Sequence, residues 1–343
     1  MDVMIGVDPH KRSHTATMID RDERELRRIT VRSGRYQLAE LLQWADDVRP
    51  SSWAVESASG MGYLLAQQLV GAGETVLDVP ATLASRVRVL GSGRSTKTDP
   101  NDARAVAVAA LRAPSLPVVH TADHTVVCRL VVRRHGDLAR WRNKLCCRLH
   151  ALVAELVAGG IAKEVVVNQA RSLLENITPD TPAGWERHRQ AHELTAEIAE
   201  LDHLLHETRA RVATAVTASG TTLTEIFGIG PVIAAMLIGY SGDPTRFTTP
   251  GRYAAYTGTA PVEFSSGGRV VHRLSRRGNR RLNHAIHMAA VTQIRHRHSP
   301  GRGYYERKLE QGHTPREALR VLKRRLSDVI WRHLTADARA AGQ

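Results

Sequence analysis

Short apolar runs alternate with segments of helical spacing along the first part of the chain. The first run, residues 3–8, ends in an acid, and two further runs follow it at distances that suit hairpins. Beyond them, apolar residues recur at steps of three and four, the spacing of a helix with one buried face. The expected order is three strands, a helix, a strand, a helix and a strand, over residues 3–8, 14–19, 26–31, 36–48, 53–56, 61–70 and 75–79.

A further helix is expected to begin near residue 99. Asp99 suits the N-cap and Pro100 the first helical position. Asp102 follows at i+3, so both carboxylates lie on one side of the helix, next to the positive end of its dipole. Behind them, a buried face is predicted from Ala103, Val106, Ala107 and Ala110. With this helix the order becomes that of an α/β RNase H-like (RuvC-like) fold, in which the first and fourth strands are neighbours.

Acids end both of those neighbouring strands, at Asp8 and Glu56. We therefore expect these carboxylates to converge with Asp99 and Asp102. Acids packed closely repel one another unless a cation is present, and hard oxygen ligands select Mg²⁺ or Mn²⁺. Such a cluster can hold the ions that flank a phosphate in phosphoryl transfer. Two plainer interpretations stay open: solvated strand ends for Asp8 and Glu56, and an ordinary helix cap for Asp99 and Asp102.

The charge balance points to a polyanionic partner. The 343 residues include 48 Lys and Arg against 34 Asp and Glu, a formal net charge of +14. Nucleic acid is the commonest partner of this kind. The three cysteines form no CxxC pair, which indicates a reducing compartment. No apolar run reaches the ~20 residues that span a bilayer, so we expect no membrane partner and a cytoplasmic, nucleoid-associated protein.

The middle of the chain is expected to be helical. Residues 126–156 are rich in arginine and carry a partial apolar seam, and residues 185–216 resume with apolar residues at steps of three or four. Two antiparallel arms of a coiled coil would satisfy both stretches, and so would an internal helical hairpin. We interpret residues 116–217 as a spacer and dimerisation element between domains at 1–115 and 218–343.

The last third, expected to be mainly α-helical, combines a glycine turn, a serine–glycine stretch and a run of arginines. Gly228 and Gly230 open an apolar helix and resemble the hairpin of helix-hairpin-helix DNA binders, although a plain tight turn fits equally well. Ser265 and Ser266 precede two glycines, where a phosphate could approach the main chain, or where a flexible turn could stand. The candidate phosphate-binding arginines are Arg269, Arg273, Arg276, Arg277, Arg280 and Arg281.

Three motifs resemble one known family. Gly6-Val7-Asp8-Pro9-His10-Lys11, Val55-Glu56-Ser57 and Lys97-Thr98-Asp99-Pro100-Asn101-Asp102-Ala103 are similar to those of the DEDD transposases in the insertion-sequence family numbered one hundred and ten. The region from Gly228 to Arg281 is similar to the family's second, transposase domain.

The resemblance implies residue roles and partners. It implies a RuvC-like domain whose Asp, Glu, Asp, Asp set corresponds to Asp8, Glu56, Asp99 and Asp102. It also implies a nucleophilic serine before a glycine, for which Ser266 fits best and Ser265 next. A family member would insert its own element through a covalent phosphoserine link to DNA. A non-coding bridge RNA would pair with donor and target DNA. Separately from the resemblance, we expect a homo-oligomer, a dimer or a tetramer.

We therefore expect a Mg²⁺-dependent (or Mn²⁺-dependent) DNA transposase of a bacterial insertion sequence. The nearest alternative is a RuvC-like nuclease or Holliday-junction resolvase in which water attacks and Ser266 is structural. The other alternative is a non-catalytic nucleic-acid-binding protein.

Overall fold

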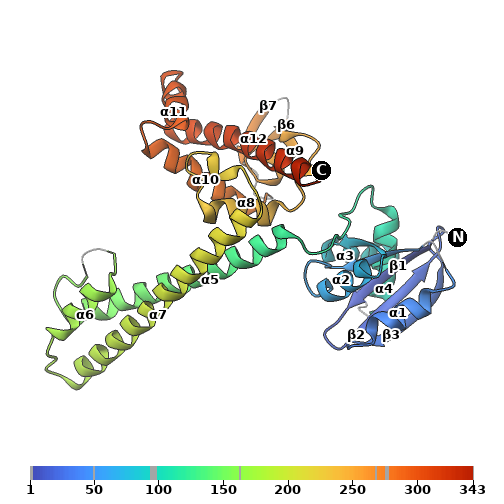
Figure 1. The fold of residues 1–343 in the computed structure, drawn as a ribbon, viewed down its shortest axis with the longest axis horizontal. Helices are drawn as coiled ribbons and strands as arrows, with labels where there is room; N and C mark the ends of the chain where they lie inside the picture. Colours follow the sequence, from blue (N-terminus) through green and yellow to red (C-terminus); the bar gives the residue numbers. More distant parts are fainter. Residues whose placement is uncertain are drawn as a thin grey trace. The chain divides into compact units, whose positions relative to one another are not determined.

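The computed structural model describes residues 3–48, 51–92, 99–161, 164–266, 269–274 and 278–342. The chain divides into two compact units, Met1–Ala122 and Asp123–Gln343 (Figure 1). The division into domains at 1–115, 116–217 and 218–343 stays a prediction.

A mixed five-stranded sheet forms the centre of the first unit (Figure 1). Its spatial order is β3-β2-β1-β4-β5, with β1 antiparallel to β2 and parallel to β4. The strands are β1 (Val3–Pro9), β2 (Ser13–Ile19), β3 (Glu25–Arg32), β4 (Ser51–Glu56) and β5 (Thr75–Val79). The first and fourth strands are thus neighbours, as the RNase H-like layout requires, and the predicted fold class is confirmed.

The two faces of the sheet carry side chains of different size. On β1 and β4, large side chains such as Ile5 and Trp53 join one core cluster, which also contains Leu41 and Leu65. Successive residues of a strand point to opposite faces, and the other face carries small residues such as Ala54. Helices α1 (Gln37–Ala45) and α2 (Tyr63–Gly71) cover the first face, and α3 (Ala81–Ser92) and α4 (Asp99–Arg112) cover the second.

Helix α4 has the buried face that the sequence predicted. Ala103, Val106 and Ala107 are fully buried and Ala110 is 7% exposed. The helix begins at Asp99 itself, one residue before the predicted first helical position, a difference within the usual uncertainty of helix ends. Helix α3 was not predicted.

An antiparallel helical hairpin dominates the first part of the second unit (Figure 1). It consists of α5 (His124–Ala154) and α7 (Pro182–Ala218), with α6 (Val167–Glu175) packed near the bend. Side-chain contacts run in opposite order along the two helices, because His135 meets Thr208 while Arg142 meets Asp202. The predicted helical middle is confirmed, the two stretches pack together within one chain, and the dimerisation role stays a prediction.

The remainder of the second unit is a helical body with one β-hairpin. Its elements are α8 (Pro231–Ser241), α9 (Pro250–Tyr256), β6 (Pro261–Ser266), β7 (Arg269–Leu274), α10 (Arg280–Arg295), α11 (Pro300–Glu310) and α12 (Pro315–Ala341), with short 3₁₀ turns at Leu223–Glu225 and Pro244–Arg246. One apolar core joins these helices to the ends of α5 and α7. Within the described residues, none of the helices is both long and apolar enough to span a bilayer.

Candidate active site

The sheet register brings Asp8 and Glu56 side by side. Val7 pairs with Val55 in the parallel β1–β4 ladder, and the two acids are the next residues along each strand. The Asp8 side chain is only 7% exposed, and its Oδ2 lies 3.1 Å from Nε2 of His10. Asp8 is therefore buried and is not a freely solvated strand end, and Glu56 is half-buried.

A glycine lets the acid-bearing helix α4 rest directly on β1. A Cβ added to Gly6 would lie 2.2 Å from the Ala103 carbonyl oxygen and 2.4 Å from the Ala107 nitrogen. No side chain larger than hydrogen fits that space. This close approach holds the first turn of α4 near the end of β1 and buries Asp102, which is 4% exposed.

The turn after β4 fixes the position of Glu56. Ser57 adopts the left-handed region with φ of 50°, and its backbone N–H donates to the Val79 carbonyl at 2.9 Å. Gly62 packs against the same place, since a Cβ there would lie 2.9 Å from the Glu56 carbonyl oxygen. The backbone on both sides of Glu56 is thus held by the neighbouring strand and the start of α2.

The acids interact electrostatically. Burial raises the pKa of Glu56 above its ordinary value, and the charge of Asp8, a side-chain hydrogen bond with Asp8 and the charge of Asp102 raise it further. The Arg88 charge opposes these effects. Three predicted site residues, Asp8, Glu56 and Asp102, are therefore neighbours that repel one another when ionised.

A cation from an unpredicted element already contacts this cluster. Arg88 of α3 forms an ion pair with Asp102 through Nη1 and Oδ1. Among the side chains that the structure describes, no group of three or more His, Cys, Asp or Glu is arranged to hold a metal ion. Asp99 belongs to the first turn of α4, but its side chain lies outside the described part.

The chemistry of the donor set fits a hard divalent cation. Asp8, Glu56 and Asp102 supply carboxylate oxygens, the ligands that Mg²⁺ and Mn²⁺ prefer, and burial together with the neighbouring acids raises the pKa of Glu56. Convergence of these acids on one ion would bring the ion close to Arg88, which is paired with Oδ1 of Asp102.

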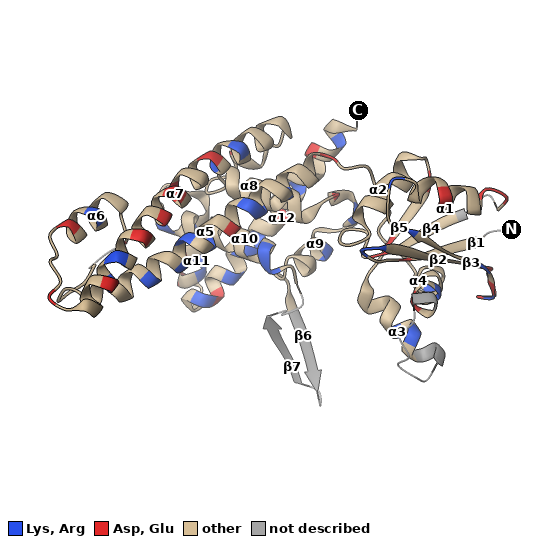
Figure 2. Ribbon diagram, turned by 90° about the horizontal axis from the view of Figure 1, so that it is seen from below, with Lys and Arg blue, Asp and Glu red and all other residues tan. Residues whose placement is uncertain are grey.

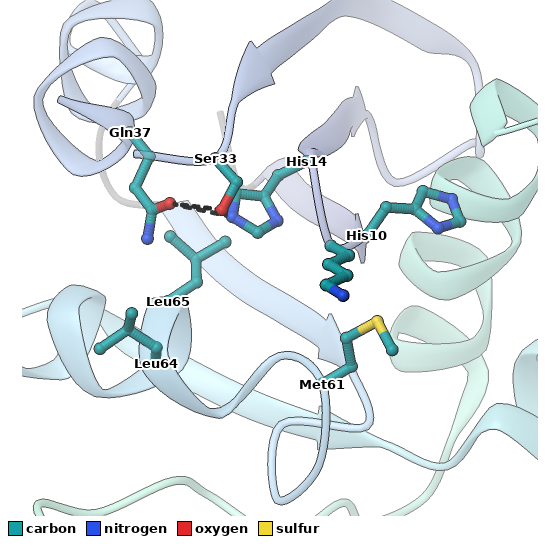
Figure 3. Close-up of a pocket in the computed structure, with 8 residues that line it drawn as sticks. His10, His14, Ser33, Gln37, Met61, Leu64 and Leu65 are labelled. Atoms are coloured by element: carbon teal, nitrogen blue, oxygen red, sulfur yellow. Dashed lines mark hydrogen bonds between the residues drawn. The ribbon is translucent and has the colours of Figure 1, made fainter. Parts of the chain in front are cut away.

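A cavity of about 230 Å³ is lined in part by His10, the residue that pairs with Asp8 (Figure 3). Its polar wall includes His14, whose Nε2 lies 3.1 Å from the Gln37 Oε1, and Ser33, whose hydroxyl donates to the same oxygen at 3.3 Å. Its apolar wall includes Met61 and Leu64, which are 65% and 64% exposed. The cavity is thus open, partly apolar and in contact with the residue that pairs with Asp8.

The predicted nucleophile belongs to the second unit. Ser266 ends β6, where it pairs in register with Arg269 of β7, and Ser265 pairs with Val270. The side chains of both serines lie outside the described part, as do residues 267–268 between the strands. The structure therefore places the Ser266 backbone in a β-hairpin and leaves its role a prediction.

Hydrogen bonds and close packing hold together the two ends of the segment that forms the β6–β7 hairpin. The Asn283 amide donates to the carbonyls of Thr257 and Gly258, both at 3.0 Å. A Cβ added to Gly278 would lie 2.5 Å from the Gly258 Cα, so the two ends of the hairpin segment touch. Lys323 of α12 in turn donates to the Asn283 side chain at 2.7 Å.

The structure describes some of the predicted phosphate-binding residues. Arg280 is exposed at the start of α10, and the Arg281 guanidinium lies 5.2 Å from the Tyr240 ring centre. The arginines of α10 lie at its two ends, Arg280 and Arg281 at the start and Arg295 at the end; the ribbon in Figure 2 is blue at Lys and Arg. Only the backbone is described for Arg269 and Arg273, and Arg276 and Arg277 lie outside the described residues.

The predicted glycine turn packs inside the second unit. Gly228 has φ of +84°, and a Cβ there would lie 3.1 Å from the Ala289 carbonyl oxygen of α10. Gly230 is the N-cap of α8, and nothing would meet a Cβ added to it. Part of the turn is thus covered by α10, and phosphate binding by it stays a prediction.

Sequence comparison places this chain among known transposases. A family model described as "Transposase" (DEDD_Tnp_IS110) matches residues 5–157, and one described as "Transposase IS116/IS110/IS902 family" matches residues 220–306. The chain is 26% identical to a protein of insertion element IS116 from Streptomyces clavuligerus, covering 96% of this chain and 94% of that protein. It is 27% identical to a protein of insertion element IS900 from Mycobacterium paratuberculosis, again over 96% and 94%.

Among solved structures, a Thermus thermophilus RuvC structure is 17% identical with a TM-score of 0.27, covering 34% of this chain and 99% of that one. A complex of RuvC with a Holliday junction substrate gives 17% and 0.28, over 35% and 100%.

The RNase H-like sheet and the matches to both ends of the chain define a DNA-acting enzyme, a transposase of an insertion sequence. The chain belongs to the IS116/IS110/IS902 transposase family, and the two family models match separate stretches of it.

Proposed function

We propose that this transposase cleaves and joins DNA strands with Ser266 as the nucleophile and with Mg²⁺, or Mn²⁺ in its place, held by Asp8, Glu56, Asp99 and Asp102. The observation that carries the proposal is the partly buried acid cluster, in which the pKa of Glu56 is raised by burial and by its neighbours Asp8 and Asp102. A group of ionised acids without a structural role is costly to keep in such a place.

The proposed role of the acids depends on their being held in fixed positions. Asp8 and Glu56 are held by adjacent strands, and Asp102 by a helix that touches one of those strands. Rigid elements of this kind hold charged groups with the accuracy that phosphoryl transfer needs. A bound divalent ion would supply electrostatic stabilisation of the charge that develops on the phosphate.

Ser266 would attack the scissile phosphodiester. A bond forms between its Oγ and phosphorus, the bond from phosphorus to one sugar oxygen breaks, and that oxygen leaves with a proton as a free hydroxyl. The serine proton passes to a base, for which the carboxylates of the first unit are the candidates. Reversal of the step with a hydroxyl of another strand joins the DNA and releases Ser266, so exchange needs no external energy source.

The serine and the acids belong to different units, so they would meet through assembly, within one chain or between chains of a dimer or tetramer. Donor and target DNA are the substrates, which implies action at the nucleoid. A bridge RNA that pairs with both DNAs would supply the sequence choice. The protein would then need backbone contacts, for which the net charge of +14 and residues such as Arg280 and Arg281 are suited.

Paired acid variants test the metal-binding half of the proposal. Asp8→Asn and Asp102→Asn keep the size of each side chain and remove its charge. We expect both to abolish Mg²⁺-dependent strand cleavage and to weaken Mn²⁺ binding measured by calorimetry. Asp22→Asn is the control, because Asp22 is an exposed residue of the same unit. Undiminished recombination by an Asp8→Asn, Asp102→Asn protein would favour a non-catalytic nucleic-acid-binding role.

A serine variant distinguishes strand transfer from hydrolysis. With Ser266→Ala we expect loss of both cleavage and strand transfer, and Ser265→Ala is the neighbouring comparison. Persistent full cleavage by Ser266→Ala would identify a nuclease or Holliday-junction resolvase that uses water. Loss of activity only with Ser265→Ala would move the nucleophile by one residue.

A further inference from the structure

Among the side chains that the structure describes, Arg88 is a strongly charged group at the acid cluster that the proposed chemistry leaves unused. It lies on α3, and its side chain is 22% exposed while that of Asp102 is 5% exposed. The same guanidinium reaches the Ser85 hydroxyl of its own helix at 3.5 Å. Its charge also acts on Glu56, where it opposes the effect of the neighbouring acids.

A guanidinium in this position offsets the negative charge of the acids, as a bound metal ion would. Arginine stays protonated at any pH that the protein meets, so its charge is permanent. A buried carboxylate such as Asp102 is costly unless it is paired, and Arg88 supplies the pair. In the protein without metal, Arg88 therefore reduces the repulsion among Asp8, Glu56 and Asp102.

The same contact opposes metal binding. The Asp102 Oδ1 accepts a hydrogen bond from Arg88, so that oxygen is less available to an ion, and two cations at one carboxylate repel each other. The Arg88 contact and a bound divalent ion therefore oppose each other at Asp102.

We propose that Arg88 is the positively charged partner of the acid cluster in the metal-free protein. Arg88 stabilises that state and competes with the divalent ion for Asp102. Binding of the ion displaces the guanidinium from Asp102. This inference rests on the proposed function, because it takes the acid cluster to be the metal site. It concerns a positioning residue on a helix that belongs to none of the three sequence motifs.

Metal titration of the full-length protein tests the inference without any measurement of activity. Arg88→Gln removes the charge and keeps a polar side chain of moderate length. Arg86→Gln is the matched control, since Arg86 is an exposed arginine of the same helix. Each protein is freed of metal with a chelator and titrated with MnCl₂ in a calorimeter, and its thermal unfolding is recorded with and without MnCl₂.

We expect Arg88→Gln to bind Mn²⁺ at least about fivefold more tightly than the native protein, the lower end of typical coupling between two sites. Its unfolding temperature without metal should fall by several degrees, because Asp102 loses its partner, and MnCl₂ should restore most of that loss. Arg86→Gln should match the native protein in both measurements.

Equal or weaker Mn²⁺ binding by Arg88→Gln would overturn the inference, because a competing cation must weaken metal affinity. If Arg88→Gln does not fold without metal, Arg88→Lys takes its place. Lysine keeps the charge but loses the forked donor geometry, so its contact with Asp102 should be weaker. Tighter Mn²⁺ binding by Arg88→Lys than by the native protein supports the inference, and equal or weaker Mn²⁺ binding overturns it.

Failure of the proposed metal site gives a different result. In that case the native protein and the Asp8→Asn variant do not differ in Mn²⁺ binding. The unfolding temperature of Arg88→Gln without metal still reports whether Arg88 stabilises the acids.

Discussion

Replacing Gly6 with alanine is the smallest change that separates the two halves of the acid cluster. The added methyl group would lie 2.2 Å from the Ala103 carbonyl oxygen and 2.7 Å from the Ala107 Cβ. To reach ordinary van der Waals separation, α4 must move away from β1 by roughly an ångström. Because Asp102 moves with α4 while Asp8 stays on β1, the substitution acts on the distance between the acids.

The expected effects of Gly6→Ala are large on activity and moderate on stability. Overpacking of a tight contact costs about 1–3 kcal/mol of unfolding free energy. A displacement of about 1 Å in a site that depends on positioning costs about 100-fold in rate. We therefore expect Mg²⁺-dependent cleavage to fall about 100-fold while the protein still folds.

Cleavage kinetics and urea unfolding of the same preparations measure both effects. The control is Gly71→Ala, because nothing lies within 4 Å of a Cβ added to Gly71 at the end of α2. It should retain native activity and unchanged or slightly higher stability. Native cleavage rates in Gly6→Ala would refute the claim that close packing of α4 on β1 sets the geometry of the acids.

Further substitutions test the parts that surround the site. Leu149→Ala should cost about 2–5 kcal/mol of unfolding free energy, since Leu149 is fully buried in the α5–α7 hairpin; Leu130→Ala, at a leucine of the same helix that is 61% exposed, should cost almost nothing. Burial holds the pKa of His14 below its ordinary value of 6.5, so the stability that the neutral ring contributes is present above that pH and is lost as the pH falls through the lowered pKa. The urea midpoint of the native protein should decline there, and His14→Gln should remove that part of the slope. Asn283→Ala removes two hydrogen bonds from the base of the β6–β7 hairpin, and we expect about tenfold slower strand transfer, equivalent to ~1.4 kcal/mol, with unchanged Mn²⁺ affinity; unchanged transfer would mean that these hydrogen bonds do not position the hairpin.

The sequence predicted the elements whose signals are local. The apolar run ending in Asp8 and the buried strand ending in Glu56 both proved to be strands, and their pairing follows from the fold layout. The helix after Asp99 was predicted because a cap, a proline and a regular apolar face coincide in one short stretch. Each of these signals depends on residues close in sequence.

The missed features depend on tertiary contacts. Helix α3 has arginines at residues 86 and 88 and a weak apolar pattern, so its periodicity did not stand out. The contact of Arg88 with Asp102 joins two helices and has no signature in either one. The sequence predicted the acids, and the structure adds a cation, Arg88, that is paired with Asp102.

The central claim concerns a covalent bond between Ser266 and DNA, and trapping that bond tests it most directly. The full-length protein is incubated with MgCl₂, its element DNA and flanking non-coding RNA, quenched with denaturant, and digested for mass spectrometry. The account predicts a peptide containing Ser266 that carries a nucleotide phosphate, present with native protein and absent with Asp8→Asn or Ser266→Ala. Complete strand exchange without any phosphoserine peptide, or with a phosphate on a different residue, would contradict the account.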